Sequence, residues 1–136
     1  MSATDYQEYH GIAEAFIGRA LGLGLPMNSL KLMVDASRHQ ESYIWIDPPW
    51  TLSNDGARII GSDDYPDPDG PDYHADHESW GSVVLSALDE AVLQAVTIEP
   101  DGSTEFVFGN NVRLVVAVQG VSRDPESWYD DWYAKP

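Results

Sequence analysis

Apolar and polar residues alternate along much of this chain, and the alternation predicts a fold rich in antiparallel strands. Within 29–36, the residues Leu30, Leu32 and Val34 fall on one face while Lys31 and Asp35 fall on the other, as in a half-buried strand. Residues 42–47 form a second such segment, which two prolines bring to an end. We therefore expect each of these strands to pack one face against a core.

Two turn sequences predict hairpins. The segments WTLS and ARIIG flank Asn-Asp-Gly, which favours a tight turn between two strands. Further along, Gly-Asn-Asn separates STEFVFG from a long alternating segment. Together with the run LQAVTIE, which precedes STEFVFG, these segments predict strands at 50–53, 57–61, 93–99, 103–109 and 112–119.

Helical spacing of apolar residues occurs near the start of the chain. Tyr9, Ile12, Phe16 and Ala20 recur at intervals of three or four residues, so 4–20 is predicted to be a helix with one buried stripe. The sequence LGLGLP that follows is expected to end this helix.

A second, short helix is predicted for the segment that begins at Asp124. Asp124 suits the N-cap position, and Glu126 suits the positive end of the helix dipole. Trp128 and Trp132 are four residues apart and would share one face of the helix. The sequence leaves open whether these C-terminal aromatics are buried or exposed.

The middle of the chain has no clear period. Residues 62–80 show neither alternation nor helical spacing, and we predict a loop there. Residues 82–92 are compatible with a helical turn or a strand. A loop of this length is uncommon in a compact domain unless it is functional or disordered.

The segments 32–52 and 96–114 follow a similar plan of aliphatic strand, polar turn and aromatic strand. This indicates a single domain, 1–136, with possible halves at 29–61 and 82–119 joined by the acidic loop 62–80. Any two three-stranded meanders align in this way, so duplication stays open. The predicted fold class is α+β: an N-terminal helix on a mostly antiparallel sheet, or on a β-sandwich of two similar β-meander halves, closed by a short C-terminal helix.

Composition and charge narrow the function. The chain has seven basic and 23 acidic residues, a formal net charge of −16. Such a field repels nucleic acid and anionic membranes and attracts cationic partners. There are no cysteines, and the N-terminal segment lacks the basic and apolar regions of a secretory signal. No apolar run is long enough to span a bilayer, so we expect a cytoplasmic protein that binds neither nucleic acid directly nor a membrane.

The acids are clustered, and two clusters are candidate partner-binding surfaces. The first lies at 63–78. The second, at 124–131, alternates with aromatic residues, a combination that suits a protein interface in which aromatic side chains anchor and charges steer. The candidate partner-binding residues are Asp63, Asp64, Asp67, Asp69, Asp72, Asp76, Glu78, Asp124, Glu126, Trp128, Asp130, Asp131 and Trp132.

A metal site in 64–78 is the alternative. Placing Gly70 at the turn of a calcium loop makes Asp67 and Asp69 ligands, but it puts Tyr65 where the first carboxylate is needed. The calcium site would draw on Asp67, Asp69, Asp72 and Asp76. A zinc site would instead use His74 and His77, with Asp72, Asp76 and Glu78 nearby.

Catalytic motifs do not appear in the sequence. There is no Gly-x-Ser-x-Gly elbow, no P-loop and no Gly-x-Gly-x-x-Gly. We therefore expect a protein that is not an enzyme and uses no cofactor, with a small enzyme of another kind as a further alternative.

The run LSALDEAVLQAVTIEPDGSTEFVFGNNVRLVV, followed by ESWYDDW, resembles small acidic bacterial domains of the polymorphic-toxin immunity protein type. The likeness covers roughly 85–132 and consists of a strand–turn–strand core and a late Glu-x-Trp. It implies a cytosolic, non-catalytic inhibitor that occludes a basic partner such as a toxin or nuclease. It transfers no contact residue, because such contacts differ from pair to pair.

Overall fold

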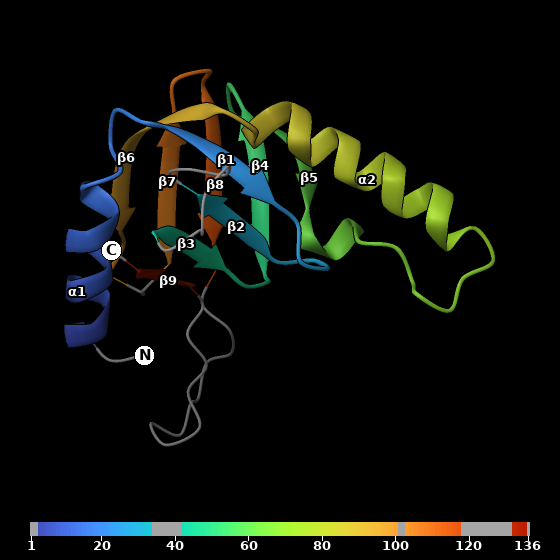
Figure 1. Cartoon of the computed structure of the whole chain (residues 1–136), viewed down its shortest axis with the longest axis horizontal. Coiled ribbons are helices and arrows are strands. Elements are labelled where there is room, and N and C mark those ends of the chain that lie inside the picture. The colour runs from blue at the N-terminus through green and yellow to red at the C-terminus, as the bar shows by residue number, and fades with distance from the viewer. Residues whose placement is uncertain (1–2, 34–41, 101–102, 118–131, 136) are drawn as a thin grey trace.

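The computed structural model describes residues 3–33, 42–100, 103–117 and 132–135 (Figure 1). Within these ranges the helical elements are α1 (Ala3–Glu14), the 3-10 turn η1 (Ser62–Asp64) and α2 (Tyr73–Leu88). The strands are β1 (Ala20–Gly24), β2 (Leu30–Met33), β3 (Tyr43–Ile46), β4 (Trp50–Asn54), β5 (Ala57–Gly61), β6 (Ala91–Ile98), β7 (Thr104–Phe108), β8 (Val112–Val116) and β9 (Trp132–Lys135).

The described strands form one antiparallel sheet in the order β5-β4-β8-β7-β6-β1-β2-β3-β9. The sheet is strongly curled, because strands far apart in this order touch. Trp132 on β9 donates a hydrogen bond of 2.8 Å to the Thr104 hydroxyl on β7, and its ring meets Phe106 edge-on at 5.1 Å between centroids. The concave face therefore encloses the core.

Side chains from alternate positions of the strands fill this concave face. Trp50, Phe106, Phe108 and Trp132 are its largest members, and each is at most 1% exposed. Around them lie leucines, isoleucines and valines of β1–β6 and β8. The predicted α+β class with a mostly antiparallel sheet is thus confirmed.

Both predicted hairpins are present. β4 and β5 are joined by Asp55 and Gly56, whose φ angles of 51° and 85° are both positive, as a tight turn that matches the strand twist requires. β7 and β8 pair through Val107 and Arg113 around the Gly-Asn-Asn turn.

The N-terminal helix is shorter than predicted. α1 ends at Glu14, and Ala20, expected on its buried stripe, is exposed at the start of β1. The segment LGLGLP does not merely end a helix: its first residues are strand β1, which pairs with β2 and β6. α1 packs beside β6 and β9 (Figure 1), where His10 Nε2 lies 2.8 Å from the Val96 carbonyl oxygen.

The predicted loop 62–80 is wrong in its second half. Residues 73–80 begin α2, which continues to Leu88 and settles the ambiguous segment 82–92 as helix followed by the start of β6. α2 extends away from the sheet (Figure 1). In the described part of the chain no helix is both long and apolar enough to cross a membrane.

The described residues at the C-terminal end form a strand and not the predicted helix. Trp132–Lys135 is strand β9, paired with β3, and its burial alternates, with Trp132 and Ala134 inside. Residues 124–131, where the helix was predicted to begin, lie outside the described residues.

The two matching β-meander halves are not reproduced by the strand pairing. β6, β7 and β8 form a meander, but β3 pairs with β2 and β9, and β4 pairs with β5 and β8. β3 and β4 are consecutive in the sequence, with Pro48 and Pro49 between them, but they are not paired with each other. The described strands belong to one curled sheet, and the β-sandwich alternative is not shown.

Candidate partner-binding surface

The acidic cluster predicted at 63–78 occupies one continuous segment, which we call the acidic arm. It comprises the end of η1, the loop 65–72 and the first turns of α2, and it leads out to the far end of α2 (Figure 1). All seven of its acids are exposed: Asp63, Asp64, Asp67, Asp69, Asp72, Asp76 and Glu78.

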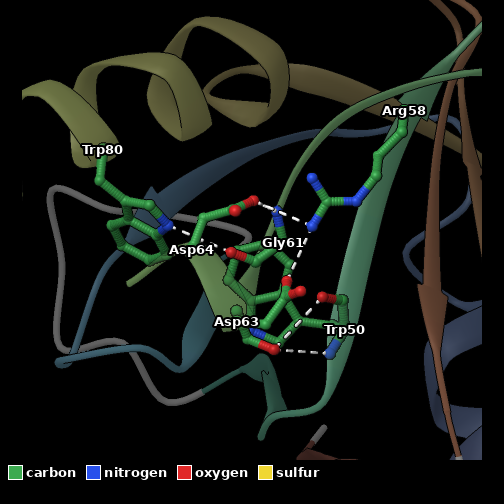
Figure 2. Close-up of polar contacts among 7 residues, drawn as sticks. Trp50, Arg58, Gly61, Asp63, Asp64 and Trp80 are labelled. Carbon is green, nitrogen blue, oxygen red and sulfur yellow. Dashed lines mark hydrogen bonds and ion pairs between the residues drawn. The ribbon is translucent and has the colours of Figure 1, made fainter. Parts of the chain in front are cut away.

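The base of the arm is fixed to the end of the curled sheet. The Ser62 hydroxyl, buried beside β4, accepts a hydrogen bond of 3.0 Å from the Trp50 amide. Trp80 Nε1 donates to the Gly61 carbonyl at 3.2 Å, as Figure 2 shows. Gly61 has no room for a larger side chain, since a Cβ there would lie 3.0 Å from the Trp50 carbonyl oxygen.

Arg58 on β5 neutralises the first two acids of the arm. Its guanidinium lies 2.8 Å from Asp63 Oδ1 and 2.9 Å from Asp64 Oδ2 (Figure 2). The Asp64 carboxylate also accepts a hydrogen bond from the Gly61 amide. These side chains are largely exposed, so the ion pairs orient η1 more than they stabilise the fold.

Four rings support the underside of the arm. Tyr65 meets Trp80 edge-on at 5.0 Å between centroids and His77 at 5.5 Å, and Tyr73 lies 5.5 Å from His77. The Tyr65 and Tyr73 hydroxyls share a hydrogen bond of 2.5 Å. Because Tyr73, His77 and Trp80 lie on the inner face of α2, the cluster joins the loop to the helix.

The Tyr65 phenol has a raised pKa. Burial raises the pKa of Tyr65 to about 12, and the hydrogen bond and electrostatic repulsion from Tyr73 act in the same direction. The neutral phenol is therefore favoured in the folded state.

This shift predicts a loss of stability in alkali. The contribution of Tyr65 should be complete below its ordinary pKa of about 10 and should be lost as the pH rises through about 12. Urea denaturation across this pH range should show a weaker decline for Tyr65→Phe than for the unmodified chain. Tyr43→Phe, which changes a tyrosine on β3, is the control. Identical declines in all three proteins would contradict the prediction.

Local hydrogen bonds shape the loop of the arm without gathering its carboxylates. Asp67 Oδ1 accepts from the Asp69 amide at 3.0 Å, and the Gly70 amide donates to the Asp67 carbonyl at 2.9 Å. In the residues that the structure describes, no three His, Cys, Asp or Glu side chains are grouped to hold a metal ion. His77 packs among the rings, while His74 is exposed on α2 beside Tyr73.

Trp132 is the C-terminal candidate that the structure describes, and it lies apart from the arm. Trp132 is fully buried and contacts Tyr9 and Phe106, so it is a core residue and not an exposed anchor. Asp124, Glu126, Trp128, Asp130 and Asp131 lie outside the described residues.

A groove beside α2 was not anticipated from the sequence. It has a volume of about 370 Å³ and lies between α2 and three strands, at Asn54 of β4, Ile59 of β5 and Val112 of β8. The Asn110 side chain closes one end by donating a hydrogen bond of 2.9 Å to the Ala87 carbonyl. No sequence motif marks this groove. If 73–88 is recognised as one helix, Val83 and Ala87, four residues apart, are placed side by side on the same face of that helix.

Comparison of the chain with protein-family models, with curated proteins and with solved structures finds no match.

Proposed function

We propose that this chain is a non-enzymatic, cytoplasmic protein-binding module of the immunity type, which inhibits a toxin, nuclease or other basic effector by occlusion. The observation that supports the proposal is the exposure of all seven acids of the acidic arm on a segment that leads away from the sheet (Figure 1). A concentration of charge of one sign on a single segment attracts and steers a partner of the opposite sign.

The charges of the arm are largely uncompensated within the described residues. Arg58 pairs with Asp63 and Asp64 at the base, and no described Lys or Arg forms an ion pair with the five acids beyond them: Asp67, Asp69, Asp72, Asp76 and Glu78. A partner's lysines and arginines would complete these pairs. Long-range attraction would raise the association rate and make it depend on salt.

Neutralising the arm should weaken binding more than the same loss of charge elsewhere. We expect the Asp→Asn change at Asp67, Asp69, Asp72 and Asp76 together to slow association with a basic partner by roughly tenfold or more at low salt. The partner to test is the protein encoded beside the gene for this chain, and association is measured by surface plasmon resonance.

The control variant removes four exposed charges away from the arm. It carries Gln at Glu8, Glu90 and Glu99 and Asn at Asp55, all of them exposed. Poly-L-lysine, which responds to net charge, should bind the two variants equally well, whereas the partner should discriminate between them. Equal losses toward the partner would show that net charge, and not the arm, is recognised.

A further inference from the structure

The groove beside α2 has a mixed lining. Its apolar residues are Val83 and Ala87 of α2, Ile59 of β5 and Val112 of β8, and its polar residues are Asn54, Ser82, Ser86 and Asn110. Val83 is 40% exposed, so this flank of the helix is only partly covered by the sheet. Ligand pockets in proteins span about 300–1,000 Å³. At about 370 Å³ this groove is at the small end of that range, and it is open to solvent, so it suits one inserted side chain better than a small molecule that must be mostly enclosed.

The groove lies in line with carboxylates of the acidic arm. A helix turns about 100° per residue, so Asp76, seven residues before Val83, projects from the same flank of α2, and Asp72 is the N-cap residue that immediately precedes the helix. With a rise of about 1.5 Å per residue, the two acids stand roughly 10 Å and roughly 16 Å from Val83 along the helix. This side of α2 therefore carries negative charge at the N-terminal end and a partly apolar recess toward the C-terminal end.

These two features together specify a ligand chemistry. Among the described residues, Asp72 and Asp76 form no ion pair, and the net charge of −16 disfavours an anionic ligand. A purely apolar ligand would use the recess and leave the carboxylates unmatched. A basic peptide segment that carries one aliphatic side chain matches both features.

We propose that the partner contributes an extended basic segment that lies along this flank of α2, with an aliphatic side chain in the groove and Lys or Arg opposite Asp76 and Asp72. The inference rests on the proposed function and identifies which part of the partner the arm recognises. An extended chain advances about 3.3 Å per residue. The basic residues are therefore expected about three and about five positions from the aliphatic one.

The test uses the full chain and two synthetic peptides. One peptide has a central leucine with arginines about three and about five positions away on both sides, which makes it independent of chain direction; the other has serine in place of leucine. Fluorescence anisotropy should show that the leucine peptide binds about tenfold more tightly, as expected for burying one such side chain.

Two matched variants of α2 test whether the leucine of the peptide occupies the groove. Val83→Ser should abolish the preference for the leucine peptide. Leu85→Ser, at a residue that is also 40% exposed but projects from another flank, should keep it. Circular dichroism melting checks that both variants are folded.

The outcomes separate this inference from the proposed function. Equal binding of both peptides, or a leucine preference that survives Val83→Ser, would overturn the groove as the anchor site while leaving the charge-based proposal in place. Failure of both peptides to bind at low salt would overturn the acidic arm as a basic-ligand surface, and the groove inference with it.

Discussion

Replacing Trp132 by alanine is expected to lower the free energy of unfolding by about 3–5 kcal/mol, the cost of emptying a large buried site. The indole is fully buried, packs against Phe106 and Tyr9, and donates a hydrogen bond to the Thr104 hydroxyl. Removing it opens a cavity and leaves Thr104 without this donor. Urea denaturation followed by far-ultraviolet circular dichroism measures the loss.

Trp45 provides the control for this experiment. It lies on neighbouring strand β3, is only partly buried, and stacks on Tyr133 with an interplanar angle of 12°. Its replacement by alanine should cost about 1–2 kcal/mol, since less surface leaves water on folding. If Trp132→Ala were no more destabilising than Trp45→Ala, the assignment of Trp132 to the core through β9 would be wrong.

Replacing Trp80 by alanine should have the second largest effect, about 3–4 kcal/mol, and should also loosen the acidic arm. Trp80 is 4% exposed and contacts Trp50 and Tyr65, so it joins α2, the loop and the core. Its loss also removes the donor to the Gly61 carbonyl. Denaturation measures the stability, and hydrogen exchange should rise in 62–72.

Trp80→Phe separates packing from hydrogen bonding. Phenylalanine keeps an aromatic ring between Trp50 and Tyr65 but lacks the indole N–H, so the expected loss is about 1–2 kcal/mol. Faster exchange in 62–72 should appear with alanine and be small with phenylalanine. Equal exchange in both variants and the unmodified chain would show that Trp80 does not hold the arm.

The elements that could be predicted from the sequence are those whose signals are local. Asn-Asp-Gly requires positive φ angles that few other residues tolerate, and the β4–β5 turn has them. Alternation in VRLVV leaves Val112, Leu114 and Val116 inside. Neither feature depends on the rest of the chain.

The elements that were missed depend on distant partners. β1 consists of alternating leucines and glycines, a sequence with poor strand propensity, and becomes a strand because it completes the ladder between β6 and β2. β9 was predicted as helix because Trp128 and Trp132 are four residues apart. Its pairing with β3 buries Trp132 and outweighs that local preference.

The start of α2 was missed for a different reason. Asp, Pro and Gly around 64–72 made the whole segment look like loop, although Tyr73, His77, Trp80, Val84 and Leu88 follow the helical period and form the inner face. The exposure of the acids could be predicted, since charged residues are rarely buried unpaired. The groove could not, because Ile59 and Val112 reach it only through the tertiary fold.

The position of β9 in the sheet has a consequence for how the chain acquires its structure during synthesis. Trp132 leaves the ribosome after every other described strand, yet it covers Phe106 and pairs β9 with β3. Until then β3 has an unpaired edge and the centre of the core faces water, conditions that favour association between nascent chains. Closure of the sheet therefore waits until β9 has been synthesised, and chaperones would act on the chain in the interval before this strand docks.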